Sequence, residues 1–215
     1  MSIPLAARLR EATRELHTEV ERAGVMRSLL RGELDRAGYC ALLRNLHALY
    51  EPLEQGLARH AGHPALAALV DPALFRSDGL AQDLSSLHGP HWADEIAVVP
   101  AASDYAAHLR DLDAAAPLHL AAHAYVRYLG DLSGGQVLAS RVSRQLELAS
   151  GIGVAFYDFG PSATVAAHAK SMRMALDQLA QDEDEAAALV DEACAAFVRH
   201  RQLFEALASP AARVA

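Results

Sequence analysis

Three glycines interrupt a segment that otherwise has the pattern of one long helix, and they restrict what this chain can fold into more than any other feature. From about Leu118 to Leu148 there is no proline, and apolar residues recur at helical spacing. The middle of the segment reads Gly130-Asp131-Leu132-Ser133-Gly134-Gly135-Gln136. Each glycine inside a helix costs roughly 1 kcal/mol relative to alanine. The chain therefore requires backbone rather than side chains at this surface.

Helical periodicity recurs along most of the chain. We expect helices at 4–22, 36–59, 102–114, 118–148, 162–180 and 183–207, with shorter ones at 64–70 and 79–88. Pro52 falls inside the second helix and should bend it or restart it. No run alternates with period two, and no internal repeat is evident. The prediction is an all-α protein with a single domain over 1–215 and a core at about 4–208.

Composition excludes several classes of protein. Apolar residues make up 52% of the 215 and charged residues 21%, as in soluble globular proteins. The net charge of -8 argues against a nucleic-acid partner, and no apolar run is long enough to span a bilayer. The start lacks the pattern of a signal peptide, and Cys40 and Cys194 are far apart, as in a reduced protein. We therefore expect a cytoplasmic protein that binds neither membrane nor nucleic acid.

Four polar residues share one side of the first predicted helix. At 100° per residue, Arg10, Arg14, His17 and Glu21 fall within a sector of about 60° that flanks the apolar stripe. His17 can face a cleft there, and Glu21 could hydrogen-bond the imidazole nitrogen that a metal leaves free. The arginines suit carboxylates of a bound molecule. A lone helical histidine is more often a packing or surface residue, so spacing alone does not make this a site.

The glycine segment is similarly open to two interpretations. Gly130 and Gly134 are one turn apart and share a face, while Arg127 precedes Asp131 by four residues and can pair with it. A flat ligand could lie on the backbone at this face. Small residues at this spacing also permit close packing of two helices, and spacing alone favours packing.

The residues themselves point to a family. The segment 122–136, Ala-His-Ala-Tyr-Val-Arg-Tyr-Leu-Gly-Asp-Leu-Ser-Gly-Gly-Gln, resembles the signature of the haem oxygenases. The segment 9–18 is similar to the part of that family that carries the proximal histidine. Further matches are Asp83-Leu84, Gly89-Pro90, Trp92 and Gln202-Leu203-Phe204-Glu205. The resemblance extends from about Leu5 to Leu207.

The resemblance implies a helical bundle in which haem lies between the first helix and a glycine-kinked distal helix. It implies that haem b is both substrate and cofactor, and that O₂ and an external electron donor are consumed. The reaction opens the haem ring to biliverdin, CO and Fe²⁺ by way of a ferric hydroperoxide. The donor would be a ferredoxin or a flavoprotein reductase, and a phytochrome could accept the biliverdin. The alternative is a non-catalytic haem carrier or sensor with the same pocket.

The same resemblance assigns roles to individual residues. His17 matches the axial iron ligand, and Glu21 the carboxylate near its other nitrogen. Asp131 matches the aspartate of a distal water network. The remaining expected site residues are Tyr50 and Arg127 in that network, Arg10, Tyr125 and Arg173 at the propionates, Gly130, Ser133 and Gly134 over the haem face, and Met26 and Phe197 in the apolar pocket. Ala169 stands where some relatives carry a basic residue, so the α meso carbon is a default expectation for the position attacked.

Overall fold

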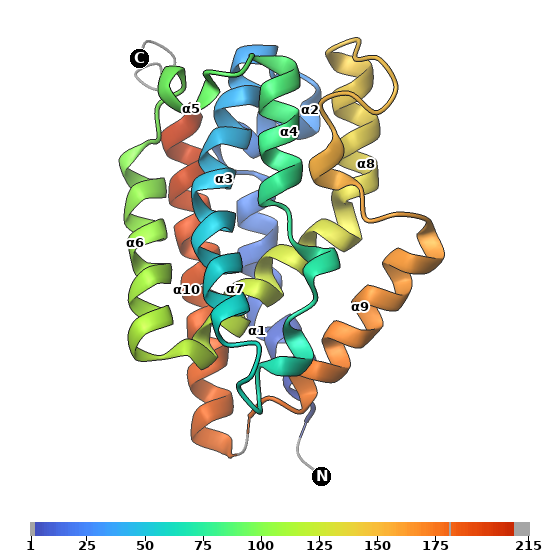
Figure 1. Ribbon diagram of the computed structural model, residues 1–215. Coiled ribbons are helices and arrows are strands. Elements are labelled where there is room, and N and C mark those ends of the chain that lie inside the picture. Colours follow the sequence, from blue (N-terminus) through green and yellow to red (C-terminus); the bar gives the residue numbers. More distant parts are fainter. Residues whose placement is uncertain (1–2, 181, 209–215) are drawn as a thin grey trace.

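The chain folds into helices, as the periodicity predicts, joined by turns and by longer loops such as those at 60–76 and 146–161 (Figure 1). The computed structural model describes residues 3–180 and 182–208, so both ends of the predicted domain, 1–2 and 209–215, lie outside the described residues. Within those ranges there is no β-strand. The helices are α1 (Leu5–Glu21), α2 (Gly24–Arg31), α3 (Arg36–Arg59), α4 (Ser77–Leu87), α5 (Trp92–Glu95), α6 (Pro100–Ala115), α7 (Leu120–Ala124), α8 (Gly130–Gln145), α9 (Ser162–Asp177) and α10 (Glu183–Ala208).

Several boundaries differ from the prediction. Helices α2 and α5 were not expected, and the helix predicted at 64–70 is only the short 3₁₀ turn η1 (Ala67–Leu69). Helix α3 runs from Arg36 to Arg59 through the buried Pro52, so the predicted restart does not occur. The other 3₁₀ turns are η2 (Pro72–Leu74), η3 (Pro117–His119) and η5 (Ala155–Tyr157).

Two helix pairs organise the core. Helix α1 packs along α10, and α3 packs against α6 and α4, so that α10 lies beside α6 and α3 in Figure 1. Ion pairs tie α1 to α10 at both ends, Arg8 to Glu183 at 2.8 Å and Arg201 to Glu19 at 2.5 Å. None of the described helices combines the length and apolar character that crossing a membrane requires.

Helix α9 is joined to the start of α1. Pro4 precedes α1 and offers no side-chain cap. The backbone N–H of Ala6 instead donates to Asp177 Oδ1 on α9 at 2.8 Å. A carboxylate suits the amino end of a helix, where backbone N–H groups lack partners and the dipole is positive. This contact links the end of α9 to the start of α1.

The glycine-containing segment is nearly continuous helix, but its winding changes. Helix α7 passes into a turn of π-helix, η4 (Tyr125–Leu129), and α8 begins at Gly130. A π turn contains one residue more than an α turn and is frequent at functional sites. The predicted single helix at 118–148 therefore has a wider turn immediately before the glycines.

Candidate active site

A cavity of about 850 Å³ lies between α1 on one side and η4 and α8 on the other. Its volume is in the range of pockets that hold cofactors. Helices α9 and α10 complete the wall. The lining residues are Pro4, Ala6, Ala7, Arg10, Glu11, Thr13, Arg14, His17, Thr18, Tyr125, Val126, Leu129, Gly130, Ser133, Arg173, Asp177 and Phe197.

The surroundings of the glycines decide between close packing and a ligand. A Cβ atom built on Gly130 or Gly134 would meet no atom within 4 Å, leaving out the backbone of the helix itself. Close helix packing, which spacing alone favours, is therefore wrong for these two positions. A Cβ on Gly135 would lie 3.4 Å from the ring of Tyr157, so this glycine does pack against the protein. Gly130 lines the cavity, and Gly134 lies one turn further along α8 without lining it.

His17 presents its imidazole to the cavity from α1, and its side chain is 54% exposed. The ring packs edge-on against Phe197 of α10, with 5.9 Å between ring centroids. Nδ1 lies 3.8 Å from Glu21 Oε1, which is too long for a direct hydrogen bond. The expected hydrogen bond is therefore absent here, because two exposed side chains one turn apart remain free to bind water. Glu21 does not line the cavity.

Cationic side chains reach the cavity from two helices. Arg10 and Arg14 come from α1, and Arg173 comes from α9. The Arg173 guanidinium donates to the carbonyl oxygen of Ala169 at 3.2 Å, so it is folded back along its own helix. Ala169, which stands where some relatives carry a basic residue, is buried. The cavity thus has cations suited to carboxylates along one edge, supplied by α1 and α9.

Sequence reasoning missed Thr13, which joins the two walls. Its hydroxyl donates to Leu9 O at 2.7 Å and therefore accepts from the hydroxyl of Tyr125, 3.1 Å away. Burial raises the pKa of Tyr125, so the phenol remains protonated and can donate. Thr13 precedes His17 by four residues, and this spacing could have revealed it.

The predicted residue Met26 lies on α2 and packs against the core rather than lining the cavity. Helix α2 is a separate helix that the periodicity did not reveal.

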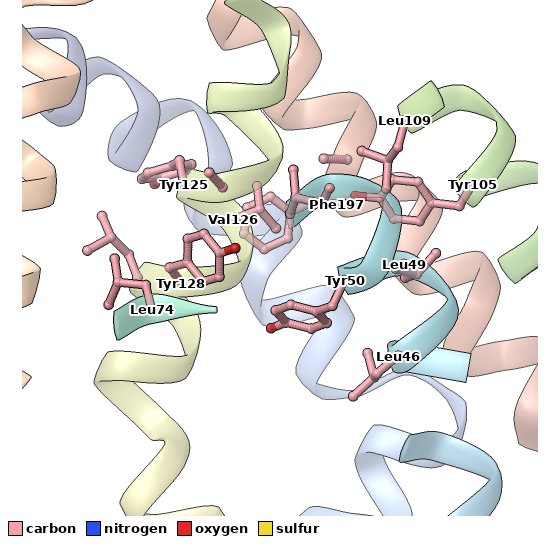
Figure 2. Close-up of a cluster of buried hydrophobic side chains, with 14 of the residues drawn as sticks. Leu46, Leu49, Tyr50, Leu74, Tyr105, Leu109, Tyr125, Val126, Tyr128 and Phe197 are labelled. Atoms are coloured by element: carbon pink, nitrogen blue, oxygen red, sulfur yellow. The ribbon is translucent and has the colours of Figure 1, made fainter. Parts of the chain in front are cut away.

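Behind Gly130, three predicted residues form a buried network. Arg127 donates from Nη2 to Asp131 Oδ1 at 2.8 Å and from Nε to the Tyr50 hydroxyl at 2.9 Å. The Tyr50 hydroxyl donates to Asp131 Oδ2. Figure 2 shows Tyr50 projecting from α3 toward the segment that carries Tyr125, Val126 and Tyr128. Each carboxylate oxygen of Asp131 thus accepts a hydrogen bond from a different side chain.

Burial governs the protonation of this network. Asp131 is only 8% exposed, and loss of solvation raises the pKa of its carboxyl, although the Arg127 charge acts in the opposite direction. Burial also raises the pKa of Tyr50 well above its usual value, which keeps the phenol a donor. Arg127 remains charged: burial lowers its pKa, but Asp131 and Tyr50 together raise it by more, so the net pKa lies above its usual value. The arrangement holds a carboxyl group in a fixed orientation with a pKa shifted toward neutrality.

Comparison with known proteins identifies the family of this chain. Residues 3–206 match the family model described as "Heme oxygenase". The chain is 37% identical to "Heme oxygenase 1" of Nostoc sp. over 207 residues, which cover 96% of this chain and 87% of the relative.

Solved structures show the same likeness. The crystal structure of heme oxygenase-1 from the cyanobacterium Synechocystis sp. in complex with heme has a TM-score of 0.87 at 36% identity, covering 94% of this chain and 91% of the other. The structure of heme oxygenase-2 from the same organism, in complex with heme and NO, has a TM-score of 0.91 at 36% identity, covering 95% and 85%. The predicted all-helical fold is thereby confirmed. This chain belongs to the haem oxygenase family and is a haem oxygenase.

Proposed function

We propose that haem b binds in the cavity between α1 and α8 as both substrate and cofactor, with the His17 imidazole as the axial iron ligand. Support comes from the exposed ring of His17 in the cavity wall and from the empty space over Gly130 and Gly134. Nδ1 is the nitrogen near Glu21, so Nε2 is the one that binds iron. Phe197 packs against the ring with 5.9 Å between centroids and an angle of 66° between the ring planes.

The propionates lie at the cationic edge of the cavity. Arg10 and Arg173 provide positive charge there, and the Tyr125 hydroxyl can turn from Thr13 to a carboxylate oxygen. Arg173 can reach a ligand when it gives up its hydrogen bond to the carbonyl oxygen of Ala169. This costs little, because that carbonyl lies inside α9 and also accepts a hydrogen bond from the helix backbone. Ser133 adds a hydroxyl on the α8 side. Because Ala169 supplies no cation, the arginines of the cavity wall, Arg14 included, and these hydroxyl groups would set the rotation of the haem, with the α meso carbon as the default position of attack.

Bound haem supplies the iron at which O₂ is activated, and electrons come from an external donor such as a ferredoxin or a flavoprotein reductase. The protein's own contribution is orientation and proton transfer. With no side chains at Gly130 and Gly134, the backbone of α8 leaves room for a flat ring to lie over it. Asp131 takes up a proton at its carboxylate and passes it, through water, toward the cavity. Its raised pKa lets it hold that proton closer to neutral pH than an exposed aspartate would.

The buried Tyr50–Arg127–Asp131 network beside the open glycines carries this proposal. A haem carrier or sensor would need the cavity and the axial histidine only. A buried carboxylate costs stability, and carriage gives no reason to keep one. The products are biliverdin, CO and Fe²⁺, with a phytochrome as a possible acceptor of the biliverdin.

Titration of the purified chain with haemin, followed by addition of a reductant in air, tests the proposal. We expect a one-to-one complex whose EPR or resonance Raman spectrum shows an axial nitrogen ligand on the iron, and conversion of the bound haem to biliverdin. His17→Ala should lose the axial nitrogen signal, whereas His88→Ala, remote from the cavity, should keep it. An unchanged axial signal in His17→Ala would overturn the ligand assignment, and a stable complex that never yields biliverdin would favour the carrier.

A further inference from the structure

A second cluster of metal-binding side chains lies outside the haem cavity. His108 of α6, His123 of α7 and Glu192 of α10 place one ligand atom each within 4.8 Å of the others. Among residues 3–180 and 182–208, no other histidine, cysteine or carboxylate group of three or more meets this condition. None of the three residues lines the cavity between α1 and α8.

Both imidazoles approach the same carboxylate oxygen, Glu192 Oε1. His108 Nε2 lies 2.7 Å from Glu192 Oε1, and His123 Nε2 lies 3.0 Å from the same oxygen. His119 Nδ1 approaches the other carboxylate oxygen at 3.8 Å. Ordinary histidine–carboxylate pairs occur elsewhere in the chain, such as His88 with Glu95 at 2.8 Å, but these pair one imidazole with one carboxylate.

The surroundings also match a metal centre. His123 is fully buried, and its Nδ1 lies 2.8 Å from the Tyr105 hydroxyl. Metal-bound histidines usually hydrogen-bond through their second nitrogen, which fixes the ring. The side chain of His108 is partly exposed and that of Glu192 less so, which leaves a route from solvent. The cluster therefore has a rigid buried ligand on one side and an accessible one on the other.

We propose that His108, His123 and Glu192 form a second metal site, which binds a divalent first-row transition ion through two imidazole nitrogens and one carboxylate oxygen. Two imidazoles and a carboxylate suit Zn²⁺ and Fe²⁺. In a tetrahedral site with bonds of about 2.0–2.1 Å, neighbouring ligand atoms are about 3.4 Å apart. The distances from Glu192 Oε1 to His108 Nε2 and His123 Nε2, 2.7 and 3.0 Å, would therefore increase by about 0.7 and 0.4 Å when the ion binds.

The position of the site suggests what a bound ion would do. The three ligands come from three helices, so the ion would cross-link α6, α7 and α10. His123 precedes Arg127 by four residues, so the cross-link would brace the chain that leads into the π turn. Fe²⁺ is the ion that the haem oxygenase reaction releases, whereas Zn²⁺ would come from the medium.

Cobalt titration of the full-length chain tests the site, because Co²⁺ bound to nitrogen and oxygen ligands absorbs visible light. All proteins carry His17→Ala, so that the haem ligand cannot bind the probe and the result is independent of the haem proposal. We expect one equivalent of Co²⁺ to bind. His108→Ala and Glu192→Gln should each weaken the affinity by at least about tenfold. His88→Ala breaks a single histidine–carboxylate pair and should leave the affinity unchanged.

Displacement of the cobalt then distinguishes the sources of the ion. Zn²⁺ in air and Fe²⁺ under anaerobic conditions are added separately to the cobalt-loaded chain, and loss of the visible bands reports exchange. Circular dichroism confirms that each variant is folded, and His108→Ala, at a partly exposed position, is the variant that should fold without difficulty. The proposal is overturned if no stoichiometric Co²⁺ binding occurs at micromolar concentration, or if His108→Ala and Glu192→Gln bind as tightly as the His88→Ala control.

Discussion

The two faces of helix α8 show how neighbouring residues of one type can serve opposite purposes. Gly134 and Gly135 are adjacent, yet a Cβ on Gly134 would meet nothing within 4 Å, and one on Gly135 would touch Tyr157. The face with Gly130 and Gly134 is open, whereas the face with Asp131, Leu132 and Gly135 is buried. The first face makes room for a ligand and the second holds the helix in the fold.

The same division applies to the polar groups of the site. The groups proposed to bind haem, such as His17 and Ser133, are exposed toward the cavity. Among the groups proposed to move protons, Tyr50 and Asp131 are buried, and Arg127 is largely covered, with 14% of its side chain exposed. Binding can use exposed groups because the ligand itself will cover them. Proton transfer at a shifted pKa requires groups that the fold already keeps from water.

Asp131→Asn tests the buried face and should have the largest effect. Asparagine keeps the shape but cannot carry the proton, so the yield of biliverdin per bound haem should fall by about 10²-fold or more. Haem affinity should change little, because the side chain does not line the cavity. Absorption spectra of single turnovers with a reductant measure both quantities. Turnover within twofold of the unmodified chain would show that the network is only structural.

Gly130→Leu and Gly135→Leu form a matched pair that separates the two faces. Leucine at 130 projects into open space, so the haem-free protein should keep its stability while haem binding is lost. Leucine at 135 would be forced against Tyr157 and should destabilise the protein by about 1–3 kcal/mol. Thermal unfolding and haemin titration of both variants check this. If Gly130→Leu also unfolds early, the face is not open.

Stability should fall in mild acid because of histidines on the buried side. His200 is buried, its Nε2 has no hydrogen-bond partner, and burial lowers its pKa well below 6.5. Its neighbours Arg127 and His123 lower the pKa further, while the carbonyl of Ala196 acts the opposite way. The unfolded state then binds more protons, so stability decreases as pH falls below 6.5. Each histidine that stays neutral accounts for about 2 kcal/mol between pH 7 and 5.

The variant His200→Phe isolates this contribution. Phenylalanine has no group to protonate, so its unfolding free energy should depend less on pH than that of the unmodified chain. Denaturant unfolding at pH 7 and at pH 5 measures the difference. His88→Phe, at a partly exposed position, serves as the control and should retain the full pH dependence. Equal slopes in His200→Phe and the unmodified chain would mean that His200 accepts a proton in the folded state.

Thr13→Val should give the smallest effect, since it removes one hydrogen bond between the cavity walls. Loss of the bond from the Tyr125 hydroxyl should cost about 0.5–1.5 kcal/mol of unfolding free energy. Thr18→Val is the matched control, because Thr18 bonds only to a carbonyl one turn back, Arg14 O at 3.2 Å. Chemical denaturation compares the two. A larger loss for Thr18→Val would contradict a linking role for Thr13.

The sequence allowed the helices to be predicted where the apolar periodicity was long, as at α1, α3 and α10. The pairing of Arg127 with Asp131 followed from spacing on one helix, but Tyr50 lies 81 positions away from Asp131 and entered only through the resemblance. Periodicity could not separate Gly134 from Gly135, because their surroundings depend on η5 and on the cavity. It also could not assemble His108, His123 and Glu192, since tertiary packing brings them together from separate helices.

The π turn at Tyr125–Leu129 determines the rotational position, about the helix axis, of the residues that follow it in α8. An α-helix advances about 100° per residue, and the π turn holds one residue more than an α turn, so regular α winding over the same residues would rotate the remainder of the helix by about that angle. Gly130 would leave the cavity wall, and Asp131 would turn away from Tyr50. The winding of this one turn thus keeps the ligand surface and the proton source at their places on the helix.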